Sequence, residues 1–181
     1  MGMTIGFVGA GQFAGSFMNL FQLHPDVDAV YATDLIPGRA EQHRARYGLA
    51  GTFPDLDAML RSDVDAVAIF TQRWTHGPLT LQALEAGKHV YSSVPMGVSE
   101  DEIAAILEKV KETGLTYMMG ETSYYNPSVV YARERIRAGK WGRVFYSEGD
   151  YVHDMDNGFY AAYHNIQVLT GPDSYPSGPR P

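Results

Sequence analysis

Short apolar runs alternate along the chain with segments whose apolar residues recur at helical spacing. The runs that are typical of buried strands cover residues 4–9, 28–34, 65–71, 89–93 and 115–120. Helices are predicted over residues 13–23, 37–47, 75–85 and 100–113, with a shorter strand and helix around Asp55. This alternation predicts an α/β fold: a doubly wound parallel sheet with right-handed crossovers.

Local signals predict where some of these helices begin and end. Pro37 suits a first helical turn, because proline lacks the amide hydrogen that would be unsatisfied there, and Gly48 suits the end of that helix. Asp55 is expected to cap the next helix. Ser99 and Glu102 have the spacing of a capping box, in which each side chain accepts a hydrogen bond from the other residue's backbone N–H.

The alternation ends near Gly120. A helix over 128–138 and a longer strand over 143–154 are predicted next, and the stretch TGPDSYPSGPRP then has neither period. We predict a first domain over residues 1–122 and a linker helix with an incomplete α+β second domain over 123–181, because the remaining residues are too few for an independent core. The chain is therefore expected to be truncated in that second domain.

Composition narrows the class of protein. The chain is 45% hydrophobic and 19% charged, as in ordinary globular proteins. Its net charge of −7, without a run of Lys or Arg, argues against a nucleic-acid partner, and the absence of cysteine excludes disulfides and thiolate sites. No apolar run approaches the length of a membrane span, and no basic leader precedes the first one. We expect a cytoplasmic protein without a membrane partner.

The stretch VGAGQFAG carries the first chemical signal. It has the form G-x-G-x-x-A, follows the first strand and opens a helix, and Asp34 ends the second strand further on. Gly9 permits the tight turn, Gly11 lets the backbone approach a pyrophosphate, and Ala14 lets the helix pack on the sheet. The Asp34 carboxylate suits ribose hydroxyls and repels a 2′-phosphate, which favours NAD over NADP. The alternative is a glycine turn of another doubly wound domain, with Asp34 capping a loop.

Two further candidates contain histidine. His76 lies just past a buried strand, where ligands sit in open α/β sheets, but it is equally consistent with a helix-terminal residue that contacts solvent. The stretch 153–156 (HDMD) contains possible ligand atoms, but its spacing matches no metal signature and a solvated loop explains it better. No metal site is predicted.

Long stretches of the chain resemble a known family. They are IGFVGAGQFAG, AIFTQRWTHGPLTLQALEAGKHVYSSVPMGVSEDE and YNPSVVYARERIRAGKWGRVFYSEGDYVHD. They resemble the Gfo/Idh/MocA oxidoreductases, which include glucose-fructose oxidoreductase and inositol dehydrogenase. The resemblance implies a Rossmann domain and the use of NAD or NADP on a hydroxyl or carbonyl of a sugar, polyol or similar small molecule.

The resemblance also identifies a departure from the family. The family's Glu-Lys-Pro motif falls on Ser93, Val94 and Pro95, and valine cannot replace a lysine that hydrogen-bonds the reacting oxygen. The family's other acid/base residues come from the second domain, so the catalytic residues of this chain are unknown. The predicted cofactor-binding residues are Gly9, Gly11, Gln12, Phe13, Ala14, Asp34, Thr71, Gln72, His76, Ser93 and Pro95.

Three functions are consistent with these residues. The first is an NAD-dependent oxidoreductase that takes a small-molecule substrate, although the catalytic competence of this short chain is doubtful. The others are a non-enzymatic NAD-binding or regulatory module, and a glycosidase or dehydratase that uses NAD transiently. The predicted strand from Val144 to Val152 would leave apolar side chains at an uncovered edge, so we expect a homo-oligomer.

Overall fold

The computed structural model describes residues 2–150 and 152, and the chain divides into two compact units, Met1–Val129 and Val130–Pro181. The first unit contains the whole sheet. The boundary that the sequence suggests, between residues 122 and 123, falls earlier in the chain and stays a prediction. Among the described residues, no helix combines the length and the apolar character needed to cross a membrane.

Strands and helices alternate through the first unit. In chain order the elements are β1 (Met3–Val8), α1 (Gln12–Gln22), β2 (Val27–Thr33), α2 (Arg39–Tyr47), β3 (Gly51–Thr52), α3 (Leu56–Leu60), β4 (Ala66–Ile69), the 3-10 helix η1 (Arg73–Thr75), α4 (His76–Glu85), β5 (His89–Ser93), α5 (Glu100–Thr113), β6 (Tyr117–Gly120), the 3-10 helix η2 (Ser123–Tyr125) and α6 (Pro127–Arg137). The strands form one sheet in the order β3-β2-β1-β4-β5-β6, and every pair is parallel. This is the strand order of a dinucleotide-binding Rossmann fold, so the predicted fold class is confirmed.

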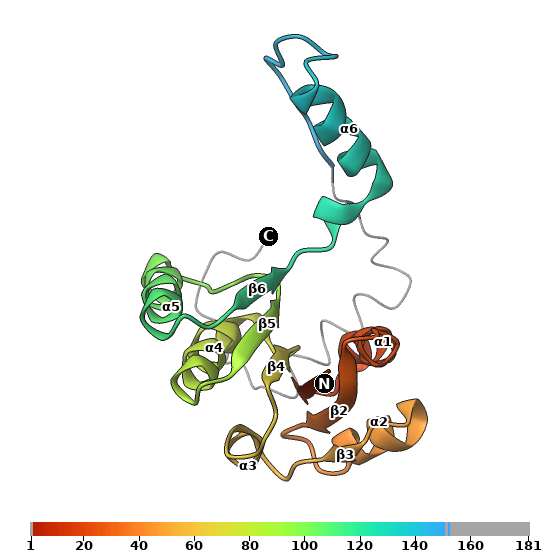
Figure 1. The fold of residues 1–181 in the computed structure, drawn as a ribbon, viewed down its shortest axis with the longest axis vertical. Coiled ribbons are helices and arrows are strands. Elements are labelled where there is room, and N and C mark those ends of the chain that lie inside the picture. Colours follow the sequence, from red (N-terminus) through yellow and green to blue (C-terminus); the bar gives the residue numbers. More distant parts are fainter. Residues whose placement is uncertain (1, 151, 153–181) are drawn as a thin grey trace. The chain divides into compact units, whose positions relative to one another are not determined.

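Each face of the sheet carries its own apolar core, because successive side chains of a strand point to opposite faces. Phe7 of β1 is fully buried in the core beneath α1 and α2, whereas its neighbour Val8 is buried in the core beneath α3, α4 and α5. Figure 1 shows these two sets of helices on opposite sides of the strands. Both faces of the central strands are therefore dry, which explains why their sequences read as continuous apolar runs.

Several helix ends follow the local sequence. Asp55 caps α3 by accepting a hydrogen bond from the Ala58 N–H at 2.7 Å, and Gly48 ends α2 in the left-handed conformation with φ 69°. The prediction that α2 begins at Pro37 is wrong, because the helix begins at Arg39 after Gly38, whose φ of 77° is not helical. That left-handed glycine turns the chain before the helix can start.

The second unit differs from the sequence expectation. Residues 142–150 form no β-strand, so the strand predicted over 143–154 is wrong for its described part. A strand needs a neighbour to accept its backbone hydrogen bonds, and no described residue pairs with this segment. Phe145 and Tyr146 are exposed, and the Tyr146 hydroxyl donates to Glu148 at 2.7 Å.

Candidate functional site

The sheet has its switch point between β1 and β4. From β1 the chain winds outward through β2 to β3, and then returns to add β4, β5 and β6 on the other side of β1. Loops that leave the carboxyl ends of β1 and β4 therefore diverge, and ligands of open α/β sheets bind in the crevice between such loops. The predicted site residues follow β1, β2, β4 and β5 at this edge.

The glycine turn after β1 needs its first glycine. Gly9 has φ +94°, and a Cβ atom built there would lie 2.7 Å from the Phe70 carbonyl oxygen, so both conformation and space exclude a side chain. Its N–H donates to the Thr33 carbonyl at 2.9 Å. Gly9 thus brings β1, β2 and the end of β4 into contact.

Gly11 plays a different part. It is the N-cap of α1 with an ordinary φ of −74°, and a Cβ atom there would meet nothing within 4 Å. The space before α1 is therefore open. Within the described residues no side chain caps this helix end, and its first turn has no acidic residue. Unpaired N–H groups and the positive end of the helix dipole thus face that space, an arrangement that suits a phosphate.

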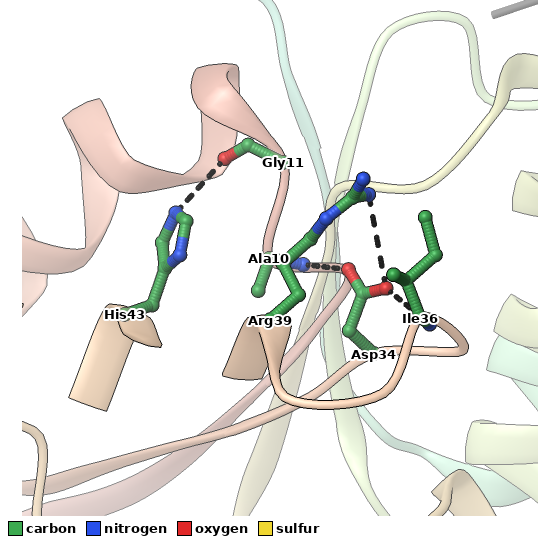
Figure 2. A network of polar contacts seen from close by, with 6 residues as sticks. All are labelled: Ala10, Gly11, Asp34, Ile36, Arg39 and His43. Carbon is green, nitrogen blue, oxygen red and sulfur yellow. Dashed lines mark hydrogen bonds and ion pairs between the residues drawn. The ribbon is translucent and has the colours of Figure 1, made fainter. Parts of the chain in front are cut away.

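Asp34 holds the turn from the other side (Figure 2). Its Oδ2 accepts a hydrogen bond from the Ala10 N–H at 2.7 Å, and its Oδ1 accepts one from the Ile36 N–H at 2.7 Å. The Arg39 guanidinium lies 3.8 Å from Oδ1. The side chain of Asp34 is 7% exposed and that of Arg39 is 33% exposed. Two backbone donors therefore fix the carboxylate in place, while each oxygen retains a lone pair.

Two residues of this cluster were not found from the sequence. Arg39 begins α2 beside Asp34, and His43, one turn further along α2, donates from Nε2 to the Gly11 carbonyl at 3.2 Å (Figure 2). The helical spacing of these two residues places both on the face of α2 that meets the glycine turn. That spacing was the available signal, but it has meaning only once α2 is known to pack beside the turn.

The next predicted residues lie at the start of α1. Gln12 and Phe13 are exposed and Ala14 is buried, which fits the close packing expected of Ala14. Phe13 is 60% exposed, although its ring centroid lies 4.9 Å from that of Phe17 and 5.9 Å from that of Phe70. Aromatic neighbours on one side therefore hold the ring, and its other side offers an apolar surface beside the glycine turn.

A second cluster joins the ends of β4 and β5 around His76. This side chain is only 1% exposed, and its Nδ1 lies 2.7 Å from the Pro95 carbonyl oxygen, which can only accept a hydrogen bond. Its Nε2 lies 3.2 Å from both the Thr71 carbonyl and the Ser93 hydroxyl. Because a carbonyl oxygen only accepts, Nδ1 donates to Pro95; in that tautomer the Ser93 hydroxyl donates to Nε2, and the approach of the Thr71 carbonyl is a contact between two acceptors. His76 therefore connects the two loops from the inside.

The remaining residues of this cluster shape its surface. The Thr71 and Thr75 hydroxyls are hydrogen-bonded at 2.7 Å, and the Thr75 hydroxyl donates to the Gln72 carbonyl at 2.7 Å. The Val94–Pro95 peptide bond is cis, and the Val94 side chain is 45% exposed. The exposed part of this corner thus includes an apolar side chain that can neither donate nor accept a proton.

Ser92 belongs to the core beside this corner. It is fully buried, and its hydroxyl lies 2.8 Å from that of Tyr117. Burial raises the pKa of Tyr117, an effect that the Ser92 hydrogen bond partly opposes. Tyr117 therefore stays neutral at physiological pH, and the pair stabilises the contact between β5 and β6.

A hollow of about 930 Å³ lies at the opposite end of the strands, near Met3, Asp65 and Lys88. Several of its polar groups have structural partners: Asp28 and Asp65 accept backbone N–H bonds from Gly2 and Thr4. Lys88 Nζ donates to the Ser62 carbonyl at 2.7 Å. No cluster of metal-ligating side chains exists here or elsewhere among the described residues, and residues 153–156 lie outside them. The edge of the sheet at the carboxyl ends of the strands thus remains the better candidate.

This combination of strand order, glycine turn, open helix terminus and acid after β2 defines a nucleotide-binding Rossmann domain. Residues 3–121 match the family model described as "Oxidoreductase family, NAD-binding Rossmann fold" (GFO_IDH_MocA). The chain belongs to this family, which confirms the resemblance found in the sequence.

Known proteins match most of this chain. A scyllo-inositol 2-dehydrogenase (NAD(+)) of Bacillus subtilis is 35% identical over 72% of this chain and 39% of its own length. A glycosyl hydrolase family 109 protein of Shewanella amazonensis is 29% identical over 84% of this chain and 36% of its own length. Scyllo-inositol dehydrogenase of Lactobacillus casei, solved with NAD(H) and scyllo-inositol, has a TM-score of 0.71 and 26% identity over 78% of this chain and 43% of its own. The chain spans less than half the length of these relatives.

Proposed function

We propose that the crevice at the carboxyl ends of β1, β2, β4 and β5 binds a nicotinamide dinucleotide. The observation that carries the proposal is the uncapped amino terminus of α1, which opens onto free space in front of Gly11. In this arrangement the pyrophosphate lies against the N–H groups of α1, and the adenosine ribose lies at Asp34. The nicotinamide half extends across Phe13 and Thr71 toward the corner at Ser93–Pro95. The cofactor would supply a hydride donor or acceptor.

We propose that NAD is preferred over NADP. The Ala10 and Ile36 N–H groups anchor the Asp34 carboxylate, so it cannot turn away from a 2′-phosphate. Arg39 offsets part of its charge from 3.8 Å and is the group that would favour NADP. The anchored acid lies between the glycine turn and the ribose position, so its repulsion acts at shorter range than the attraction of Arg39.

Calorimetric titration with NADH, NADPH and ADP-ribose tests both the site and the preference. ADP-ribose reports on the adenosine and pyrophosphate positions alone, because it lacks nicotinamide. We expect NADH to bind more tightly than NADPH, and Arg39→Ala to widen that difference. Equal or tighter binding of NADPH would overturn the preference, and failure of ADP-ribose to bind would overturn the proposed site.

The reaction that we propose is oxidation or reduction of a sugar, polyol or related small hydroxy or keto compound. The scyllo-inositol dehydrogenases among the relatives support this substrate class, because they share the cofactor domain. Such a reaction also needs a group that moves a proton to or from the reacting oxygen, and Val94 cannot do this. We propose that substrate-positioning and proton-transfer groups lie outside the described residues.

A non-enzymatic NAD-binding module is the second candidate, and Val94 is the observation that favours it. The exposed valine at the family's lysine position lacks a proton-transfer group, whereas the residues that we propose for cofactor binding are present. An NAD-assisted glycosidase is a further alternative, and the Shewanella relative supports it because it is named as a glycosyl hydrolase. NADH formation with a panel of inositols and sugars, compared with release of sugar from aryl glycosides, separates the three. Activity in neither assay, together with tight NADH binding, favours the binding module.

We further propose that the chain self-associates. The uncovered strand that the sequence predicts from Val144 to Val152 is not a strand in its described part, so strand pairing does not support this proposal. The apolar side chains of Val144, Phe145 and Tyr146 are nevertheless exposed, the second of them 92% exposed. Adjacent exposed apolar groups favour association. Sedimentation velocity over a range of protein concentrations tests this, and a stable monomer at high concentration would contradict it.

A further inference from the structure

The corner between β5 and α5 is held by two side chains that belong to different helices. His76 of α4 donates from Nδ1 to the Pro95 carbonyl at 2.7 Å. Glu102 of α5 accepts a hydrogen bond from the Val98 N–H through Oε2 at 2.8 Å. The backbone between these two points, from Pro95 to Val98, is therefore fixed at both ends.

The contact of Glu102 is not the one that a capping box predicts. The Ser99 hydroxyl accepts a hydrogen bond from the Glu102 N–H at 3.2 Å, as expected of an N-cap. The Glu102 carboxylate, however, pairs with the N–H of Val98 and not with that of Ser99. It is thus directed at the corner that precedes the helix. A hydrogen bond to a carboxylate is stronger than one between neutral groups, so this contact restrains the corner more than an ordinary turn would.

Two glycines make room for this carboxylate. A Cβ atom on Gly77 would lie 2.6 Å from Glu102 Oε2, and one on Gly97 would lie 3.0 Å from the same atom. Gly77 follows His76 at the start of α4, and α4 packs against α5. The absence of a side chain at residue 77 therefore lets α4 bring His76 to the corner and leaves space there for the Glu102 carboxylate of α5.

The fixed corner is the part of the site that the nicotinamide half would meet. Ser93 and Thr71 contact the Nε2 side of His76, and the exposed Val94 lies between Ser93 and the clamped Pro95. Since His76 is only 1% exposed, it cannot touch a ligand in the crevice itself. Its influence on a ligand passes through the backbone at Thr71 and Pro95.

We propose that His76 and Glu102 are positioning residues that clamp the β5–α5 corner for the nicotinamide half of the dinucleotide. This inference rests on the proposed function for its ligand, whereas the clamp itself consists of contacts within the chain. It assigns these two residues to the binding of nicotinamide and not to the binding of the adenosine half. A role in general stability would affect both halves alike.

The test for His76 compares two ligands and three variants of the full chain. His76→Leu removes the donor at similar size, and His76→Asn keeps a donor near the position of Nδ1. His89→Leu is the matched control. His89 lies at the start of β5, at the opposite end of that strand from the corner, and its Nδ1 accepts a hydrogen bond from the Thr116 N–H at 2.9 Å. Affinities for NADH and ADP-ribose are measured by titration, and the fluorescence of bound NADH reports on the surroundings of its nicotinamide.

We expect His76→Leu to weaken NADH about tenfold, the effect of one strong hydrogen bond, and to leave ADP-ribose within about twofold. His76→Asn should recover most of the NADH affinity and its fluorescence, and His89→Leu should leave the ratio of the two affinities unchanged. Equal losses for both ligands in His76→Leu would overturn the positioning role. So would unchanged affinity for both ligands.

Glu102 has its own test, which needs no ligand. The Val98 amide proton should resonate downfield in the NMR spectrum of the native chain. It should move upfield in Glu102→Ala and lie between these positions in Glu102→Gln, which keeps a neutral acceptor. Glu100→Ala in the same helical turn is the control and should leave the Val98 resonance in place. An unmoved Val98 resonance in Glu102→Ala would overturn the clamp. Failure of the native chain to bind ADP-ribose would instead overturn the proposed function. The Val98 resonance would still test the clamp in that case, because this measurement needs no ligand.

Discussion

The glycine turn and the β5–α5 corner lie at the same edge of one sheet, but they are built in opposite ways. At the turn, backbone N–H groups at the start of α1 face open space, and Asp34 restrains the loop by accepting a hydrogen bond from the Ala10 N–H. At the corner, the polar groups of His76 and Ser93 are turned inward, and an apolar side chain, Val94, faces the solvent. The glycine turn is therefore suited to bind a charged group, whereas the β5–α5 corner has a backbone conformation fixed by internal hydrogen bonds.

This difference suggests that the two halves of a dinucleotide would be bound by different kinds of interaction. The phosphates and ribose need donors and acceptors, which the turn and Asp34 provide. The nicotinamide needs a surface at a defined position, which buried hydrogen bonds can fix without contacting it. Substitutions at the turn should thus affect every adenine dinucleotide, whereas substitutions at the corner should affect only ligands that carry nicotinamide.

The largest effect is expected from Gly11→Asp. Aspartate is a good N-cap and fits without a clash, so the free energy of unfolding should stay unchanged or rise by up to about 1 kcal/mol. Its carboxylate would occupy the phosphate position, and like charges should weaken ADP-ribose and NADH by roughly a hundredfold or more. Chemical denaturation and titration provide the two measurements. Ser16→Asp, at an exposed position on the same helix, is the charge control, and tight NADH binding by Gly11→Asp would contradict the phosphate position.

The next effect is expected from Asp34→Ala. It leaves the Ala10 and Ile36 N–H groups without their charged acceptor, which should lower the free energy of unfolding by roughly 2–3 kcal/mol. NADH and ADP-ribose should weaken together by about tenfold, and NADPH by less, because the repulsion of its 2′-phosphate is lost as well. Asp55→Ala removes a comparable backbone acceptor away from the site, and it should lower stability without changing the ratio of NADH to NADPH affinity. A larger loss of affinity for NADPH than for NADH would contradict the role that we propose for Asp34.

Gly77→Ala should have a smaller effect, confined to the corner. The new methyl group would displace the Glu102 carboxylate, while alanine gains about 1 kcal/mol of helix propensity over glycine, so overall stability should change little. We expect NADH to weaken about threefold and ADP-ribose to be unaffected. In a double-mutant cycle, Gly77→Ala should cost nothing once Glu102→Ala is present, because the displaced group is gone. Additive effects would show that the two residues act separately.

The smallest effect is expected from Val94→Lys. Residue 94 is 45% exposed, so lysine should be accommodated with ADP-ribose affinity within about twofold of the native value. Turnover of polyols and sugars, followed by NADH absorbance, should be no faster in the variant than in the native chain. A general acid or base accelerates a reaction about 10²- to 10⁴-fold only when the substrate is held within reach, and positioning of the substrate lowers the barrier by more than that. Turnover by the variant alone would mean that the described residues already position a substrate.

The sequence predicted the features that depend on neighbours along the chain. The alternation of apolar runs predicted the doubly wound sheet, and the glycine pattern predicted the turn at Gly9 and the open start of α1. Asp55 and Ser99 were identified as caps because a cap and the helix it serves are adjacent. These features follow from backbone conformation, which a few successive residues control.

The tertiary structure decided which polar groups meet across the fold. Asp34 reaches the Ala10 N–H from 24 residues away, and His76 reaches the Pro95 carbonyl from 19 residues away. Both contacts depend on how β2 and β5 align with their neighbours, and the same residue types would be exposed in another register. The predicted strand after residue 142 is wrong for a related reason, because a strand forms only when a partner is present to pair with it. Local sequence sets what a segment can form, and contacts between distant segments determine whether it forms and what its side chains touch.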